Sequence, residues 1–456
     1  MFNLKNYKNV YMIGIGGISM SGLAHILVNW GFNVSGSNNE ENNVLNGLRE
    51  NSINVYVPHD YNNINDNVDL VVYTAAIKED NPELVHAKEL NIPIMERGEF
   101  LGELTKLFSN TIGVAGTHGK TSTTSMVSLC FLRANLDPTI QVGSLLNQIG
   151  GNYKVGKSEH FIIEACEYKD SYLNFKQKSA IILNIDNDHL DYFKTFDNIK
   201  KSFKEYVSHL PSDGLLVLNG DDKNCLELAL STNAKIITYG IGENNNYRAL
   251  NIKFDELGHG SYDLYKYNEF IDRINLSIVG EHNIMNSLAC VSLCDSYNID
   301  IKYIKEGLKT YTGASRRFEY KGEFNGAHVY DDYGHHPTEV NAVSNSILNK
   351  KYNKSWVIFE PHTYSRVKNH ASDFAKSLIN FDNIIITDIY AAREINEFGV
   401  SENDIISELE KLNKKSIHLS DYEEIKDYLK NNVSRNDLIL TLGAGYVTKL
   451  SDMLVS

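Results

Sequence analysis

The chain has 456 residues, of which 42% are hydrophobic and 22% are charged. This composition is that of a folded globular protein, and the length predicts two or three domains. The net charge of −14 argues against a nucleic-acid partner, because contacts with a phosphate backbone need clustered Lys and Arg. No stretch reaches the ~18 apolar residues that a membrane span requires, so we expect no membrane partner.

The cysteines and the first residues bear on the compartment. Five cysteines form no CxxC pair, and an odd number leaves one outside any disulfide scheme: Cys130, Cys166, Cys225, Cys290 and Cys294. We therefore expect reduced thiols. The opening MFNLKNYKNV lacks the apolar run of a secretion signal. Both observations predict a cytoplasmic protein.

The elements predicted in chain order are strand–turn–helix units, which imply parallel sheets covered by helices. The first unit is NVYMIGIGG with a helix over residues 19–30, followed by strands at 33–37 and 69–75 and a helix at 82–90. A second series starts at TIGVAGTHGKT, with a helix over 120–134 and strands at 161–163, 180–185 and 215–218. The polar segment 240–272 predicts antiparallel hairpins, and a helix follows at 281–297.

A third series starts near residue 313, with strands at 328–330, 356–359, 384–387 and 438–441. The starts of the second and third series place domain boundaries near residues 108 and 312. We thus expect three α/β domains, over residues 1–108, 109–312 and 313–456.

The segment Gly116-Thr117-His118-Gly119-Lys120-Thr121 lies between a predicted strand and a predicted helix, as a phosphate-binding loop requires. Glycines let the backbone N–H groups face phosphate oxygens, the helix N-terminus adds a favourable dipole, and the lysine adds a charge. The threonine hydroxyl suits Mg²⁺. The GxxxxGK[ST] template asks for glycine where the chain has Val114, so an ordinary glycine-rich turn is the alternative.

Acidic residues follow two of the predicted strands. Glu164 comes after the strand HFII, and the run SAIILNIDNDHLD brings Asp186, Asp188, His189 and Asp191 to a second strand end. Strand ends in open α/β sheets are where ligands bind, and Mg²⁺ prefers oxygen ligands. Chemistry alone does not select His189 for magnesium, because imidazole suits softer metals.

The loop Gly14-Ile15-Gly16-Gly17-Ile18-Ser19 resembles a dinucleotide-binding loop but departs from GxGxxG at Ser19. The acidic residue that would bind a ribose hydroxyl is also absent from the end of the second strand, where Asn38 stands. An NAD-linked dehydrogenase is therefore disfavoured. The predicted helix N-terminus still suits a pyrophosphate group.

Together these motifs resemble the Mur ligase family, and within it the alanine-adding branch, over essentially the whole chain. The strings GIGGISMSGLA, GTHGKTST, DHLD, GEHNIMN, ASRRFE, DDYGHHPTEV and PHTYSR occur in the family's order. The resemblance implies a Rossmann-like N-terminal domain, a central P-loop ATPase-type parallel sheet and a C-terminal Rossmann-like domain. It also implies ATP-dependent ligation of L-alanine to UDP-N-acetylmuramate in peptidoglycan synthesis, with Mg²⁺ as cofactor.

The resemblance further implies roles for individual residues. The UDP sugar would bind at Gly14, Gly16, Gly17 and Ser19. ATP would bind at Gly116, Thr117, His118, Gly119, Lys120, Thr121, Ser122, His282, Asn283, Asn286, Arg317 and Asp332. Metal ions would be held by Thr121, Glu164 and His189. The amino-acid and acyl-phosphate region would be lined by Tyr333, His335, His336, His362 and Arg366. Lys120, Glu164, His189 and Arg317 would be catalytic.

Some of these residues have simpler readings, and the chain departs from the family pattern in places. The pair His335-His336 before Pro337 predicts a turn cap, and Arg316-Arg317 could be a solvated basic pair. Cys166 replaces the aspartate of the family's Glu-Ala-Asp-Glu, and Thr363 stands where some alanine ligases carry arginine.

Three other functions compete. The nearest is the recycling ligase that attaches a tripeptide to the same UDP sugar. The other two are a nucleotide-dependent regulatory protein without ligase activity and the dehydrogenase disfavoured above. The sequence leaves the oligomeric state open.

Overall fold

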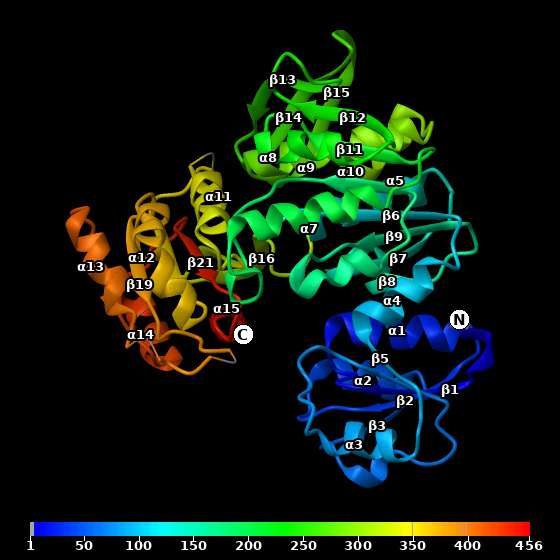
Figure 1. The fold of residues 1–456 in the computed structure, drawn as a ribbon. Helices are drawn as coiled ribbons and strands as arrows, with labels where there is room; N and C mark the ends of the chain where they lie inside the picture. Colours follow the sequence, from blue (N-terminus) through cyan, green and yellow to red (C-terminus); the bar gives the residue numbers. More distant parts are fainter. Residues whose placement is uncertain (1–3, 349, 393, 398) are drawn as a thin grey trace. The chain divides into compact units, whose positions relative to one another are not determined.

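A computed structural model describes residues 4–348, 350–392, 394–397 and 399–456 (Figure 1). The chain divides into two compact units. One contains Met1–Ala249, Leu264–Ile271 and Asn286–Thr310, and the other contains Leu250–Asp263, Asp272–Met285 and Tyr311–Ser456. Within the part of the chain that is described, no helix has the length and apolar character needed to span a bilayer. The predicted mixed α/β fold with parallel-rich sheets is confirmed.

The N-terminal sheet is entirely parallel, in the order β3-β2-β1-β4-β5. Its strands are β1 (Asn9–Ile13), β2 (Asn33–Ser37), β3 (Asn54–Tyr56), β4 (Leu70–Tyr73) and β5 (Ile94–Glu96). The helices are α1 (Ile18–Asn29), α2 (Asn43–Glu50), α3 (Pro82–Glu89) and α4 (Arg97–Thr105). The apolar run of β1 is buried on both faces, as expected for a parallel strand covered by helices on each side. The arrangement is the predicted Rossmann-like one.

The central sheet has ten strands in the order β15-β14-β13-β12-β11-β10-β6-β9-β7-β8. They are β6 (Asn110–Ala115), β7 (Thr139–Leu146), β8 (Gly151–Lys154), β9 (His160–Glu164), β10 (Ser179–Ile182), β11 (Leu215–Asn219), β12 (Lys235–Gly240), β13 (Tyr247–Phe254), β14 (His259–Lys266) and β15 (Glu269–Val279). From β12 to β7 every neighbouring pair is parallel. The loops 255–258 and 267–268 are too short for a crossover, so β13–β15 form the predicted hairpins.

The helices of this region are α5 (Lys120–Arg133), α6 (Leu190–Phe193), α7 (Phe196–Ser208), α8 (Lys223–Glu227), α9 (Glu281–Ser296) and α10 (Ile301–Thr310). Short 3₁₀ turns occur at Leu4–Asn6, Tyr61–Asn63, Asn147–Ile149, Tyr168–Asn174 and Leu228–Ser231. Because β6 lies in the middle of the sheet, its C-terminal end delivers the loop 116–119 to the centre of the carboxyl edge.

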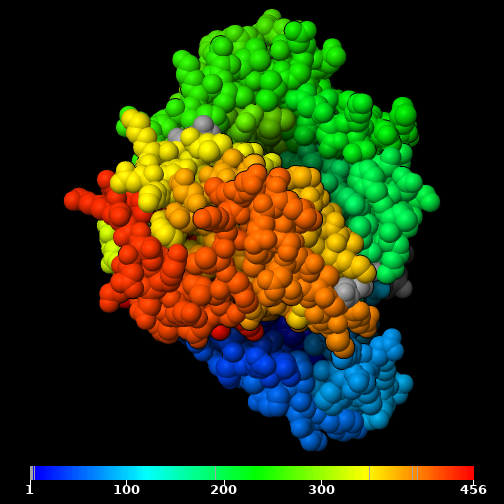
Figure 2. Space-filling view, turned by 90° about the vertical axis from the view of Figure 1, so that its left-hand side faces the viewer, coloured from blue at the N-terminus to red at the C-terminus, as the bar shows by residue number. Residues whose placement is uncertain are grey.

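The C-terminal sheet has the order β16-β17-β21-β18-β19-β20, and only the β16–β17 pair is antiparallel. Its strands are β16 (Glu319–Phe324), β17 (Ala327–Asp332), β18 (Ser355–Phe359), β19 (Asn383–Ile386), β20 (Ile417–His418) and β21 (Leu438–Leu442). The helices are α11 (Pro337–Ile347), α12 (Tyr364–Leu378), α13 (Asn403–Lys411), α14 (Tyr422–Asn432) and α15 (Thr448–Val455). Figure 2 shows this segment as one continuous surface coloured from yellow to red.

Two apolar clusters cover the two faces of the C-terminal sheet. One joins the strands to α11, α12 and α13, and the other joins them to α14 and α15. Helices on both faces explain why β18 and β21 are buried along their whole length. The same layering aligns the carboxyl ends of β17, β18 and β21 at one edge.

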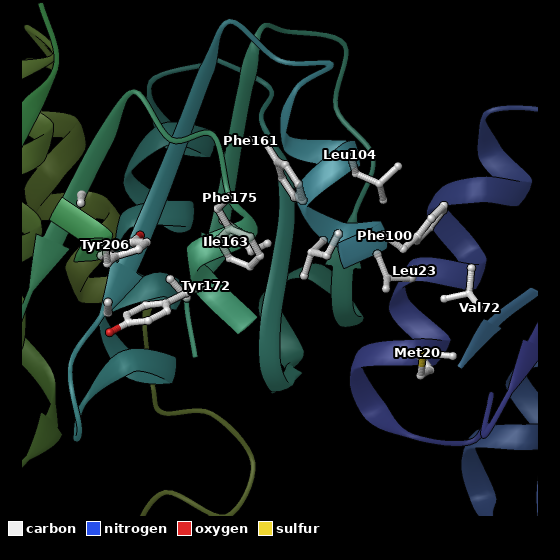
Figure 3. Packing of buried hydrophobic residues seen from close by; sticks show 14 of the residues in the cluster. Met20, Leu23, Val72, Phe100, Leu104, Phe161, Ile163, Tyr172, Phe175 and Tyr206 are labelled. Atoms are coloured by element: carbon white, nitrogen blue, oxygen red, sulfur yellow. The ribbon is translucent and has the colours of Figure 1, made fainter. Parts of the chain in front are cut away.

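A third apolar cluster runs from the N-terminal sheet into the central sheet (Figure 3). Leu23 of α1 and Phe100 and Leu104 of α4 belong to the same buried cluster as Phe161 of β9. The helix α4 ends just before the predicted boundary near residue 108. The residues on either side of that boundary therefore share one core.

Candidate active site

The loop between β6 and α5 has a backbone that depends on glycine. Gly116 has φ of +134° and Gly119 has φ of +87°, both in the region that side chains rarely adopt. A Cβ on Gly119 would lie 2.5 Å from Oδ1 of Asn286, so only glycine fits beside that side chain. Asn184 fixes the loop by accepting a hydrogen bond from the His118 N–H at 2.8 Å and donating one to the His118 carbonyl at 3.0 Å.

Lys120 begins α5 and is held in place by oxygen atoms on three sides. Its Nζ donates to the carbonyls of Gly116 at 2.6 Å and Thr117 at 3.0 Å. It also lies 3.0 Å from a carboxylate oxygen of Glu167, whose side chain is 2% exposed. Burial alone would lower the pKa of Lys120, but the negative charge of Glu167 outweighs it and raises that pKa above its ordinary value. The ammonium is therefore charged and already positioned at the loop.

Thr121 and Glu164 form a pair of oxygen ligands at the same edge. The Thr121 hydroxyl donates to Oε2 of Glu164 at 3.0 Å, and the Gly143 N–H donates to the same oxygen at 2.8 Å. A Cβ on Gly143 would meet that oxygen at 2.5 Å, so a side chain there would displace the carboxylate. A carboxylate beside a hydroxyl at a helix N-terminus suits Mg²⁺, which prefers oxygen ligands. Ser122 is buried in the first turn of α5.

Two histidines lie beside the carboxylates that follow β10. His118 Nε2 lies 3.1 Å from Oδ2 of Asp186. His189 has φ of +54°, and its Nε2 lies 3.8 Å from Oδ2 of Asp188. The His189 ring also packs against Tyr168 with centroids 4.9 Å apart. The left-handed backbone at His189 turns the chain into α6 and keeps the imidazole beside the carboxylate.

Cys166, which replaces the family's aspartate, offers no carboxylate oxygen. Burial and the neighbouring Glu167 charge raise the pKa of its thiol, which favours the neutral form. The carboxylate that reaches Lys120 is the next residue, Glu167. The sequence motifs did not point to Glu167, although it stands only three residues after Glu164.

The residues expected against adenine divide between the two compact units. Asn286 is buried and lies against the phosphate loop at Gly119. His282 and Asn283 belong to the other unit. There the Asn283 amide nitrogen donates to the Val279 carbonyl at 2.8 Å and lies 3.1 Å from His282 Nε2.

The glycines of the first loop make the predicted tight turn between β1 and α1. The N–H groups of Gly14 and Ile15 both donate to the Ser37 carbonyl, at 2.8 and 2.9 Å. Gly14 has φ of +81°, and a Cβ on Gly16 would lie 2.8 Å from the Asn42 side chain. Gly17 is the N-cap of α1. The turn thus brings backbone N–H groups and a helix N-terminus to one place, which suits an anion.

Ser19 is engaged with protein groups. Its hydroxyl accepts hydrogen bonds from Arg97 at 3.3 Å and from Gln141 at 3.2 Å. No sequence motif pointed to Arg97. Its guanidinium lies at the N-terminal end of α1, where it adds a charge suited to a phosphate.

In the C-terminal segment, Arg317 lies near the ring of Tyr333 and beside the carboxylate of Glu339. Its guanidinium lies 5.6 Å from the Tyr333 ring centroid and 3.6 Å from Oε1 of Glu339. Asp332 supports this arrangement because its two oxygens accept the Phe318 N–H at 2.8 Å and the Gly334 N–H at 2.7 Å. Burial raises the pKa of Asp332 to about 6, although the nearby Arg317 charge opposes the rise.

Arg316 has a different role from its neighbour. Its Nε lies 3.1 Å from Oδ2 of Asp331, a carboxylate with no exposed surface, and its other nitrogens donate to the carbonyls of Gly443 and Ala444. The reading of the two arginines as a solvated pair is therefore wrong for Arg316. It anchors the loop after β21 to the strand β17.

Four of the residues predicted for the amino-acid region lie together. The ring of His335 lies 5.2 Å from that of Tyr333 and 5.1 Å from that of His362. Arg366 Nη1 lies 3.0 Å from His362 Nδ1. Tyr390 adds a ring 5.5 Å from His362, a contact that the sequence did not reveal. One guanidinium among imidazole and phenol groups can bind a carboxylate.

His336 is the N-cap of α11. Its Nδ1 accepts the Thr338 N–H at 3.3 Å, and Glu339 completes a capping box. The simpler reading of this histidine as a turn cap is therefore confirmed. Glu339 also accepts the His335 N–H at 3.1 Å, so the cap and the cluster share one carboxylate.

The fold agrees with the comparisons to known proteins. Residues 9–109 match the Mur ligase family catalytic domain, residues 114–294 the Mur ligase middle domain, and residues 316–445 the Mur ligase glutamate ligase domain. The chain belongs to the Mur ligase family and is an ATP-dependent ligase.

Relatives within the family carry a narrower name. The UDP-N-acetylmuramate–L-alanine ligase of Clostridium acetobutylicum is 46% identical over 457 residues, covering 100% of this chain and 99% of the relative. The crystal structure of the UDP-N-acetylmuramate–alanine ligase of Thermotoga maritima matches with a TM-score of 0.84 and 28% identity, covering 98% of each chain. A murein peptide ligase from Psychrobacter arcticus matches with a TM-score of 0.73 and 22% identity over 98% of each chain, a likeness of fold alone.

Proposed function

We propose that this protein joins L-alanine to the lactyl carboxylate of UDP-N-acetylmuramate, with ATP converted to ADP and phosphate. The observation that carries this proposal is 46% identity, over the full length, to a ligase named for that reaction. The product would be a peptidoglycan precursor. The reduced thiols of the structure are consistent with a cytoplasmic site of action.

The chemistry must overcome the low reactivity of a carboxylate. A lactyl oxygen would attack the γ-phosphorus of ATP, the bond to ADP would break, and an acyl phosphate would form. The amine of L-alanine would then attack the acyl carbon, and phosphate would leave with the lactyl oxygen. Both steps gather negative charge, so preorganised cations are the main requirement.

Lys120 supplies one of these charges. Its Nζ lies 3.0 Å from the Glu167 carboxylate, so a bound phosphate would share the ammonium with this carboxylate. Mg²⁺, held by Thr121 and Glu164 with His189 at a second position, would offset the charge of the phosphate oxygens. Asn286 lies against the same loop and would contact the adenine side. His282 and Asn283 are proposed for the same adenine contact.

The remaining residues would position the other reactants. Arg317 would contact the transferring phosphate, and Asp332 would fix the loop that carries it through its two backbone hydrogen bonds. Tyr333, His335, His336, His362 and Arg366 would bind L-alanine and the acyl phosphate. The UDP group would bind at Gly14, Gly16, Gly17 and Ser19, with Arg97 beside Ser19 as a further phosphate ligand.

The alternative within the family is attachment of a murein tripeptide to the same UDP sugar. Full-length relatives of 44–46% identity carry the name of the alanine ligase, which favours alanine. The test is phosphate release by the purified protein with ATP, Mg²⁺ and UDP-N-acetylmuramate, in three reactions with L-alanine, with the tripeptide and with neither.

We expect release that depends on L-alanine. Release only with the tripeptide would assign the protein to the recycling reaction. A folded, ATP-binding protein that releases phosphate with neither co-substrate would contradict ligation.

A further inference from the structure

Three of the five cysteines meet in the interior, at the junction of α5, α9 and α10. Cys130 lies in the last turn of α5, and Cys290 and Cys294 lie one helical turn apart on α9. All three side chains have no exposed surface. The sulfurs are 3.7 Å apart between Cys130 and Cys290 and 3.8 Å apart between Cys290 and Cys294, and all three lie within 4.8 Å of one another.

These separations equal those between sulfur ligands of one metal ion, and Cys290 and Cys294 are badly placed for a disulfide. A tetrahedral ion with metal–sulfur bonds of about 2.3 Å places its sulfur ligands about 3.8 Å apart. A disulfide needs Cβ atoms about 3.8 Å apart, whereas residues four apart on a helix have Cβ atoms about 5–6 Å apart. Cys290 and Cys294 therefore cannot pair without unwinding α9, but both can bind one ion as they stand.

The surroundings fix the three sulfurs in place. A Cβ on Gly307 of α10 would lie 2.7 Å from both the sulfur and the Cα of Cys130, so α10 packs directly on this cysteine. The Cys130 thiol also lies 3.5 Å from the Ile304 carbonyl. Fixed side chains lose little freedom when they bind an ion, which favours affinity.

We propose that Cys130, Cys290 and Cys294 form a binding site for a thiophilic metal ion of the Zn²⁺ and Cd²⁺ class. Each thiol that binds would release one proton to solvent and donate a sulfur electron pair to the ion. Because metal binding releases these protons, we expect affinity to fall as the pH falls.

The site connects two helices that carry proposed ATP residues. Lys120 begins α5, and Asn286 precedes Cys290 by one turn on α9. A bound ion would link these helices and stabilise the folded state, because it binds the native arrangement and not the unfolded chain. The inference does not depend on which amino acid is ligated.

The test uses Cd²⁺, whose bonds to thiolates give a charge-transfer absorption in the ultraviolet. The reduced, chelator-treated full-length protein is titrated with Cd²⁺, and its melting temperature is measured with and without the ion. We expect saturation at one equivalent and a higher melting temperature. Cys130→Ala, Cys290→Ala and Cys294→Ala should each weaken binding by more than about tenfold.

Cys225→Ala is the matched control, because Cys225 is equally buried but lies on α8. This variant should bind Cd²⁺ as the parent does. Three independent variants keep the test valid if one of them fails to fold. The proposal would be overturned if the parent showed no charge-transfer absorption that saturates at one equivalent of Cd²⁺. It would also be overturned if this absorption were unchanged in every folded variant of Cys130, Cys290 and Cys294.

Discussion

At the residue scale, the most informative contact is between Lys120 and Glu167. The side chains are 12% and 2% exposed, and the charged atoms lie 3.0 Å apart. A buried ion pair contributes little net stability, but removal of one partner leaves an uncompensated charge. Stability and catalysis can therefore be separated at this pair.

We expect Lys120→Ala to lower kcat by at least about 10²–10³-fold, because it removes a preorganised charge from the phosphate loop. It should also lower the free energy of unfolding by about 3–5 kcal/mol, because the Glu167 carboxylate stays buried alone. In Lys120→Ala/Glu167→Gln, the stability should largely return while the activity stays low.

The measurements are denaturant unfolding and steady-state kinetics. Lys201→Ala, on an exposed position of α7, is the control and should change neither quantity. Near-normal turnover by Lys120→Ala would refute the role of the loop.

Asp332 leads to a pH prediction. Burial raises its pKa to about 6 from an ordinary value of 3.8, so the folded state binds its proton more tightly than the unfolded chain does. The stability from this group is fully present below about pH 4 and is lost as the pH rises through about 6, by up to about 3 kcal/mol. In Asp332→Asn this pH-dependent loss should be absent. The measurement is the free energy of unfolding of both proteins from pH 4 to 7. The same dependence on pH in the parent and in Asp332→Asn would contradict this role of Asp332.

The predictable part of the site consisted of residues in local motifs. The glycines and Lys120 of the loop 116–121 and the acid at the end of β9 follow from a strand–turn–helix pattern. Glu167 and Glu339 lie in local motifs, but their partners Lys120 and Arg317 stand 47 and 22 positions away, and Arg97 contacts Ser19 from 78 positions away. No local pattern marks such a partner.

At the scale of elements, apolar strands were predicted closely because burial on both faces makes them continuous hydrophobic runs. The strand expected at 33–37 is β2, and the helix expected at 82–90 is α3, which ends at Glu89. The edge strands β3, β5, β8, β16 and β20 were missed, because half-exposed residues such as those of Glu319–Phe324 carry no apolar run. The inner strands β7 and β12 were also missed.

The start of α11 provides a prediction at this scale. His336 caps the helix through Nδ1, and serine is also a good N-cap. His336→Ala should therefore destabilise the protein by about 1 kcal/mol, whereas His336→Ser should stay close to the parent. Thermal melting of both variants is the measurement.

Steady-state kinetics of His336→Ala and His336→Ser separate the capping role of His336 from its proposed role in the amino-acid region. A stable His336→Ser variant with a raised KM for L-alanine would support the imidazole as part of the amino-acid region. Equal destabilisation by both substitutions would contradict the capping role.

At the scale of the whole molecule, the N-terminal sheet and the central sheet share one apolar cluster. Phe100 on α4 is fully buried within it (Figure 3). Phe100→Ala should lower the free energy of unfolding by about 3–5 kcal/mol, and the loss should appear in both sheets together.

Hydrogen exchange can follow β1 and β9 in the same sample. Leu107→Ala, at a side chain that is 53% exposed, is the control and should have little effect. Loss of protection in β1 with β9 unchanged would show that the segments before and after residue 108 unfold separately.

Isotope transfer can show whether ligation proceeds through an acyl phosphate. UDP-N-acetylmuramate labelled with ¹⁸O in its lactyl carboxylate is incubated with ATP, Mg²⁺ and L-alanine, and the products are examined by mass spectrometry. We expect UDP-N-acetylmuramoyl-L-alanine together with phosphate that carries one labelled oxygen per molecule. Unlabelled phosphate, or ATP hydrolysis without the alanine product, would contradict it.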